Sequence, residues 1–128
     1  MLNISTVKKY TQEKLICVFG CGGDRDHGKR PIMGEIAGKI ADYTIITSDN
    51  PRSEDPEEII KQIEKGIKET KGSYEVIVDR KEAIKKALEM AHKKDIVIIA
   101  GKGHELTQEI KGKKYPFDER KIVKDILK

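Results

Sequence analysis

The 128-residue sequence is long enough for a single domain with one hydrophobic core. Charged residues make up 38% of it and apolar residues 37%, a balance that excludes an intrinsically disordered chain, and no apolar stretch approaches the ~20 residues of a transmembrane helix. The net charge of +4 permits nucleic-acid binding, but basic and acidic residues are interleaved along the chain, so a solvated charged surface accounts for it.

Short apolar and β-branched runs alternate with longer stretches in which apolar residues recur at helical spacing. This alternation is typical of βαβ units, whose right-handed crossovers build a mostly parallel α/β sheet with helices on both faces. The strand runs are almost wholly apolar, so we expect each strand to be buried on both faces. In chain order the sequence predicts a helix over 2–11, a strand over 15–19, a helix over 29–41, a strand over 43–47, a helix over 56–70, a strand over 74–78, a helix over 80–93, a strand over 95–100, a hairpin of 109–111 and 113–115, and a helix over 118–127.

The helix predicted over residues 56–70 has the clearest signals at its start. Ser53 is the expected N-cap, and Pro56 falls in the first turn, where proline is tolerated. Four isoleucines share one face and predict packing against the sheet: Ile59, Ile60, Ile63 and Ile67.

The chain shows no internal repeat, low-complexity segment or linker, so residues 1–128 are predicted to form one domain. A helix that begins almost at the first residue, with no strand before it, suggests a piece of a longer protein. No segment resembles a signal peptide, and the only cysteines are Cys17 and Cys21, which indicates a reducing, cytoplasmic setting. Two thiols cannot supply a four-ligand zinc site.

Ligands of parallel sheets bind beyond the carboxyl ends of the strands. Three of these ends, at residues 20–30, 48–52 and 101–105, are rich in glycine, charge or histidine. The first of these loops leaves a strand and enters a helix, so its glycines and the helix N-terminus suit an anion. It is neither a dinucleotide fingerprint, whose third glycine would fall at Arg25, nor a P-loop, because Arg30 follows Lys29. Carboxylate binding and a structural turn whose charges pair with one another both stay open.

The second loop joins a guanidinium to two small polar side chains. Arg52 could take a carboxylate through two hydrogen bonds, while Asp49 and Asn50 could hold an ammonium group. The alternative is an Asx-type turn that caps the next helix, and the two roles are compatible.

The third loop places Glu105 where it could accept a substrate ammonium. A metal site there is the less favoured alternative, while His92 is expected on the surface. That metal site would have to draw on His104, His27, Asp24 and Asp26. Acidic and basic groups thus share one predicted sheet edge, which suits a zwitterionic ligand.

Three motifs, in this order and spacing, resemble the Mur ligases, and more closely the branch of that family that adds diaminopimelate. The resemblance runs from about residue 15 to residue 128. The motifs are Gly20-Cys21-Gly22-Gly23-Asp24-Arg25-Asp26, Asp49-Asn50-Pro51-Arg52 and Gly101-Lys102-Gly103-His104-Glu105.

The resemblance implies a Rossmann-like C-terminal domain that binds the amino acid in a three-domain, ATP-dependent peptidoglycan ligase. The complete enzyme would add meso-diaminopimelate to UDP-N-acetylmuramoyl-L-alanyl-D-glutamate through an acyl phosphate. ATP and magnesium would be bound by a central domain, and the UDP sugar by an N-terminal one. This chain alone would be inactive, with no catalytic, cofactor or metal-binding residue of its own. The resemblance further implies a cytoplasmic monomer with no nucleic-acid or membrane partner.

The resemblance also assigns roles to individual residues. Arg52 would bind the distal carboxylate, which lysine lacks, and Arg25 would share it. Asp49 and Asn50 would hydrogen-bond the distal amino-acid head. Gly101, through its carbonyl, and Glu105 would hold the distal ammonium.

Two segments of the family are absent from the sequence: a Gly-Lys-Thr/Ser phosphate loop, and an Asp-Tyr-Ala-His-Thr-Pro segment expected just before the first helix. Their absence explains why catalysis is not expected from this chain alone. Alternatives are a freestanding amino-acid or anion-binding module, the lysine-adding variant of the ligase and, on charge alone, a nucleic-acid-binding domain.

Overall fold

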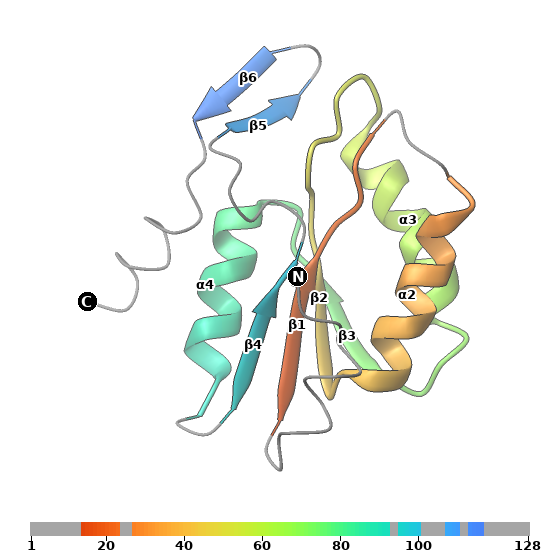
Figure 1. Cartoon of the computed structure of the whole chain (residues 1–128), viewed down its shortest axis with the longest axis vertical. Helices are drawn as coiled ribbons and strands as arrows, with labels where there is room; N and C mark the ends of the chain where they lie inside the picture. Colours follow the sequence, from red (N-terminus) through yellow and green to blue (C-terminus); the bar gives the residue numbers. More distant parts are fainter. Residues whose placement is uncertain (1–13, 24–26, 93–94, 101–106, 111–112, 117–128) are drawn as a thin grey trace.

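The computed structural model describes residues 14–23, 27–92, 95–100, 107–110 and 113–116. At its centre is a four-stranded parallel sheet in the order β3-β2-β1-β4 (Figure 1). The strands are β1 (Leu15–Phe19), β2 (Tyr43–Ile46), β3 (Ser73–Val76) and β4 (Ile96–Ile99). The predicted parallel α/β architecture is therefore confirmed. The predicted terminal helices, over 2–11 and 118–127, lie outside the described residues.

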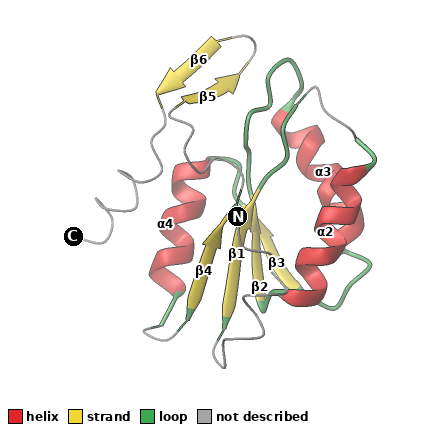
Figure 2. Ribbon diagram, viewed as in Figure 1, coloured by secondary structure: helices red, strands yellow, loops and turns green. Residues whose placement is uncertain are grey.

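Helices cover both faces of the sheet and make three layers (Figure 2). The helices α2 (Lys29–Ile40) and α3 (Pro56–Ile67) lie side by side on one face, and α4 (Arg80–Met90) lies on the other. Successive strand residues serve opposite layers, as the pleat of a strand requires. Cys17, Phe19 and Ile46 pack in the cluster that includes α2 and α3. Ile16, Val18 and Ile45 pack in the cluster that includes α4.

Burial on both faces holds for the two central strands only. All five residues of β1 are buried, and so are the last three of β2. The same expectation was wrong for β3, which is half-buried or exposed, and for β4, which is half-buried throughout. Each of these two strands pairs with a neighbour on one side only, within the described sheet.

The described helices end earlier than their apolar spacing predicts, and α2 does so by one residue, at Ile40. The helix α3 ends at Ile67, where the Thr70 hydroxyl donates to the Ile67 carbonyl oxygen at 2.7 Å. The helix α4 ends at Met90, because Ala91 has an extended backbone with ψ 138°.

The N-cap predicted for α3 at Ser53 was wrong. Asp55 caps this helix, and its carboxylate accepts from the Glu57 N–H at 2.9 Å. Pro56 occupies the first helical position, so the cap has to be the residue directly before it. The four isoleucines of the predicted buried face, Ile59, Ile60, Ile63 and Ile67, are all buried as expected.

A separate antiparallel hairpin follows the sheet, as predicted, with β5 (Thr107–Ile110) paired to β6 (Lys113–Pro116). Its strands are each longer than the sequence indicated. None of the helices in the described part of the chain has the length and apolar character needed to cross a bilayer.

Candidate functional site

The loops that leave β1 and β2 touch each other beyond the carboxyl ends of their strands. The Gly23 N–H donates to the Asn50 carbonyl oxygen at 2.6 Å. In return, Arg52 Nη1 donates to the Gly23 carbonyl oxygen at 3.0 Å, and also approaches the Asn50 carbonyl oxygen at 3.4 Å. Two loops far apart in the sequence are thus joined through both backbone groups of one glycine.

The position of Gly23 requires a glycine because the second loop lies against it. A Cβ atom there would lie 1.8 Å from the Pro51 carbonyl oxygen and 2.4 Å from the Pro51 carbonyl carbon. Both atoms belong to the backbone, so no side-chain rotation could relieve the overlap. The glycine allows the two loops to approach to hydrogen-bonding distance.

Arg52 has a strained backbone. Its φ of 52° is the only positive value at a non-glycine residue among those described. The left-handed region costs an L-residue about 1–2 kcal/mol, and such strain gathers at functional sites. This conformation accompanies the hydrogen bond from the Arg52 guanidinium to the opposite loop.

The polar residues before Arg52 are enclosed to different degrees. Asn50 is 7% exposed, whereas Asp49 is half-buried. Burial raises the pKa of the Cys21 thiol to about 11, an effect that the Arg30 guanidinium opposes and the Asp49 carboxylate reinforces. Asp49 therefore acts electrostatically on the first loop.

The second loop, residues 48–52, does not supply the N-cap of α3, because Asp55 caps this helix.

A buried arginine, Arg30, fixes the first loop to the segment that follows the second. It is 1% exposed and forms a two-pronged pair with Glu54, with N–O distances of 3.1 and 2.8 Å. It also donates to the Gly22 carbonyl oxygen at 2.8 Å and to Gln62 Oε1 of α3 at 2.9 Å. Its charge is thus paired outside its own loop.

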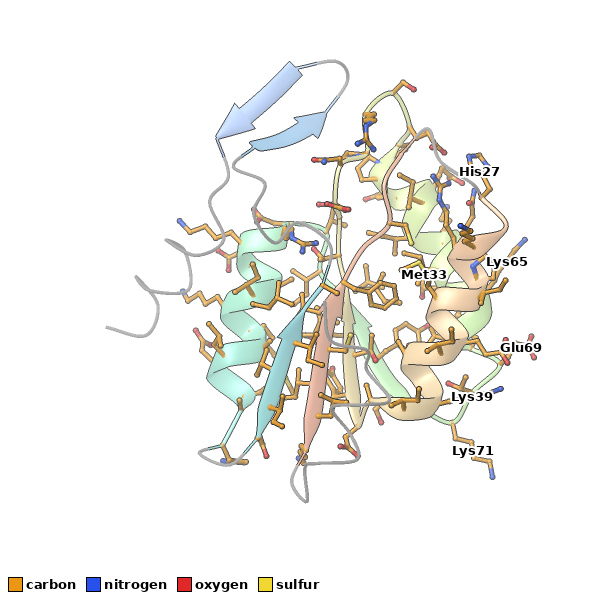
Figure 3. All side chains as sticks on the ribbon, viewed as in Figure 1. His27, Met33, Lys39, Lys65, Glu69 and Lys71 are labelled. Carbon is orange, nitrogen blue, oxygen red and sulfur yellow. The ribbon has the colours of Figure 1, made fainter. Side chains whose placement is uncertain are left out.

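His27 joins the same cluster from its exposed side. Its Nε2 lies 3.2 Å from Glu54 Oε1, and the side chain stands at the N-terminal end of α2 (Figure 3). No three His, Cys, Asp or Glu side chains among the described residues are placed to hold a metal ion. Of the side chains considered above for such a site, His27 alone is described.

A second buried arginine, Arg80, reaches two other strand ends. It is the first residue of α4 and is 1% exposed. Its Nη1 donates to the Ser48 carbonyl oxygen at 3.1 Å, and its Nη2 to the Ala100 carbonyl oxygen at 2.8 Å. Ser48 leads into the second loop, and Ala100 directly precedes the third.

Three of the six predicted binding residues are described: Asp49, Asn50 and Arg52. Asn50 and Arg52 are hydrogen-bonded to Gly23, and Asp49 directly precedes them in the same loop. The other three, Arg25, Gly101 and Glu105, lie outside the described residues. No role was predicted for Arg30 or Arg80. A signal was present, because each stands in the first turn of a helix, where a cation opposes the helix dipole.

Residues 3–103 match the family described as "Mur ligase, glutamate ligase domain", and the chain belongs to this family. It is 60% identical over 97% of its length to the UDP-N-acetylmuramoyl-L-alanyl-D-glutamate--2,6-diaminopimelate ligase of Caldanaerobacter subterraneus subsp. tengcongensis. It is 57% identical over 91% of its length to the enzyme of the same name from Nitrosomonas europaea.

A solved structure of a UDP-N-acetylmuramoyl-L-alanyl-D-glutamate--2,6-diaminopimelate ligase superposes with a TM-score of 0.90 and 48% identity over 97% of the chain. The resemblance seen in the three motifs is therefore confirmed at the level of family and fold. The chain spans about a quarter of each of these proteins: 26% of the Caldanaerobacter relative, 22% of the Nitrosomonas relative and 26% of the solved chain.

Proposed function

We propose that this chain is the amino-acid-binding C-terminal domain of a ligase that adds meso-diaminopimelate to UDP-N-acetylmuramoyl-L-alanyl-D-glutamate in peptidoglycan synthesis. Residues 1–128 are taken as one domain of a longer, monomeric, cytoplasmic protein. Family membership and the names of the relatives support the kind of ligase; the monomeric state and the cytoplasmic location are parts of the proposal. The observation that carries the proposal is the hydrogen bond from Arg52 to Gly23, because it joins two of the three family motifs.

The ligand chemistry fits this part of the domain. Diaminopimelate has a carboxylate and an ammonium group at each end, whereas lysine has no carboxylate at its distal end. We assign the distal carboxylate to Arg52 and Arg25, since a guanidinium suits a two-pronged bond to a carboxylate. Asp49 and Asn50 would hydrogen-bond the same end of the molecule. The Gly101 carbonyl and the Glu105 carboxylate would hold its ammonium group.

The domain's contribution to the reaction is orientation. The amine of the incoming amino acid attacks the carbonyl carbon of an acyl phosphate, the C–N bond forms, the C–O bond to phosphate breaks, and the nitrogen loses a proton. Because the domain binds the distal end of the amino acid, the reacting amine at the other end is held in a fixed position and orientation. Such positioning can supply about 7–11 kcal/mol of a reaction barrier.

ATP and magnesium do not fit the described residues. The sequence has no Gly-Lys-Thr/Ser phosphate loop, and no three carboxylate, histidine or cysteine side chains cluster in the described part of the chain. We therefore propose that both groups are bound mainly by a central domain that carries the phosphate loop.

The test is made on the full-length protein that contains this chain. Phosphate release from ATP should require both the UDP-linked dipeptide and an amino acid, with diaminopimelate preferred over lysine. The isolated chain should release none. A full-length protein that prefers lysine would identify the lysine-adding variant. Ligand binding by a native protein no longer than this chain, without any ligase activity, would identify a freestanding binding module instead.

Further tests address the remaining partners. Gel filtration of the full-length protein should give the mass of a monomer. The isolated chain should bind diaminopimelate weakly, because no neighbouring domain excludes water from its charged groups. If the protein is retained on DNA, and this retention falls steeply with salt, the hypothesis of a nucleic-acid-binding domain is supported instead.

A further inference from the structure

The buried guanidinium of Arg80 ties together the segments that lead into two of the three binding loops. It donates to the carbonyl oxygens of Ser48 and Ala100, which follow β2 and β4, two strands that are not neighbours in the sheet. Ser48 directly precedes the loop of Asp49, Asn50 and Arg52. Ala100 directly precedes the segment 101–105.

Ser48 is held from its other side as well. Its N–H and its hydroxyl both donate to the Val78 carbonyl oxygen, at 3.3 and 2.8 Å. The Thr47 hydroxyl donates to the same oxygen at 3.1 Å. Val78 lies on the connection from β3 to α4, and Arg80 follows two residues later as the first residue of α4, so this short segment fixes both the N–H and the carbonyl of Ser48.

This placement of a cation is unfavourable by itself. Arg80 begins α4, where the positive end of the helix dipole repels a guanidinium, and it is 1% exposed. A rigid fork with several donors can bridge two carbonyl oxygens, which a lysine ammonium on a flexible stem cannot do in the same geometry. The arrangement suits a spacer between two backbone segments.

We infer that Arg80 is a positioning residue for the amino-acid site and sets the separation between the Ser48 and Ala100 carbonyl groups, which stand directly before the two segments assigned to the ligand. The inference rests on the proposed function. The distal carboxylate and ammonium of diaminopimelate are bonded to the same carbon atom. The groups that bind them, from the loops after Ser48 and after Ala100, must therefore stand at a fixed distance, and Arg80 is hydrogen-bonded to the start of both.

The test uses Arg80→Lys and Arg80→Met in the full-length enzyme, with Ile84→Ala as the matched control. Ile84 lies one turn further along α4, fully buried in the core under the sheet. Its truncation should lower the melting temperature, while the hydrogen bonds from Arg80 to Ser48 and Ala100 stay in place. We expect both Arg80 variants to raise the KM for diaminopimelate by about 10- to 100-fold, since ~1 Å of misplacement can cost that much. The KM for ATP should stay within about twofold in all variants, and Ile84→Ala should leave both KM values unchanged.

Amide hydrogen exchange without ligand separates this inference from the proposed function. Exchange in residues 48–52 and at Ala100 should become faster in Arg80→Lys and stay unchanged in Ile84→Ala. If exchange at these residues is unaffected in a folded Arg80→Lys protein, or if its KM for diaminopimelate matches wild type, Arg80 has no positioning role. Faster exchange in a protein whose wild type does not use diaminopimelate would overturn the proposed substrate but support the spacing role of Arg80.

Discussion

The Arg52 guanidinium donates a hydrogen bond to the Gly23 carbonyl oxygen at 3.0 Å, across 29 residues of sequence. The Gly23 N–H is bonded to the Asn50 carbonyl oxygen in turn. The first and second loops therefore behave as one unit, and a change in either should alter both. This pairing also directs the guanidinium, so that any carboxylate it binds must lie close to the glycine-rich loop.

Arg52→Ala in the full-length enzyme should remove much of the preference for diaminopimelate over lysine. Losing one partner of a desolvated charge pair costs roughly 2–5 kcal/mol, whereas lysine has no distal carboxylate to lose. Arg52→Lys should not restore the preference, because an ammonium cannot form the two-pronged bond. The measurement is kcat/KM for both amino acids. Equal proportional losses for the two substrates would show that Arg52 only holds the loop together.

The strained backbone at position 52 gives a second, independent outcome. Arg52→Gly should be more stable than Arg52→Ala by about 1 kcal/mol, because glycine adopts a positive φ without a Cβ clash. Urea unfolding of the two variants measures the difference. Both should show the same loss of amino-acid preference, since both lack the guanidinium. A more stable alanine variant would contradict the positive φ.

Gly23→Ala should separate the two loops. Its Cβ would lie 1.8 Å from the Pro51 carbonyl oxygen, so the backbone has to shift, at a cost of about 1–3 kcal/mol. The KM for the amino acid should rise together with the loss of stability. Gly72→Ala is the matched control, because its Cβ would lie 2.4 Å from the Gly38 carbonyl oxygen at the opposite end of the sheet. It should lower stability alone, and an equal rise in KM in this control would contradict the prediction.

Arg30→Met should destabilise the domain by about 3 kcal/mol, at the low end for a buried ion pair because Glu54 is 21% exposed. The substitution removes the guanidinium, so Glu54, Gln62 and the Gly22 carbonyl all lose their hydrogen-bond donor. Urea unfolding measures the loss. Lys39→Met is the control, since its pair with Glu35 is solvent-exposed, and it should change stability by less than ~0.5 kcal/mol. Similar losses of unfolding free energy in the two variants would show that the buried pair stabilises the domain no more than an exposed pair does.

The free energy of unfolding should fall as the pH rises from about 9 to about 12. Burial raises the pKa of the Cys17 thiol from 9.0 to about 12. Below pH 9 the thiol is protonated in both states, so the contribution to stability is complete. Above pH 9 the unfolded chain releases this proton while the folded chain retains it, which favours unfolding until the pH passes the folded pKa.

Tyr43 adds to this slope above pH 10. Burial, together with its hydrogen bond to Glu75, raises the pKa of its hydroxyl to about 12. Urea unfolding at several alkaline pH values measures the slope, and Cys17→Ala should flatten it between pH 9 and 10. An unchanged slope in Cys17→Ala would show that the Cys17 thiol does not contribute to it.

Both native cysteines should also resist thiol reagents near neutral pH, because both are buried.

Local patterns were enough to predict most of the fold, and they failed where the outcome depends on partners distant in sequence. The spacing of Ile59, Ile60, Ile63 and Ile67 predicts a buried helix face, and all four are buried. The partial exposure of β3 and β4 could not be predicted, because an apolar run does not say whether its strand has one neighbour or two.

The same limit applies to the candidate site. Asp49, Asn50 and Arg52 could be singled out because they stand together directly after a strand and match a family motif. The roles of Arg30 and Arg80 could not be foreseen, since their hydrogen-bond partners lie from 8 to 32 residues away and include backbone carbonyls of any residue type. A cation in the first turn of a helix is the only local sign of such a role.

The strand order has a consequence for the nascent chain. The apolar strand β1 lies between β2 and β4, and its partners in β4 begin at Ile96, so one edge of β1 stays open until nearly the whole sheet has been synthesised. An unpaired apolar edge is a template for aggregation. The strand that closes this edge also leads through Ala100 into the third loop. In the same late folding step, therefore, the fully buried strand β1 gains its second neighbour, and Ala100, directly before the third predicted binding segment, reaches the carboxyl end of the sheet.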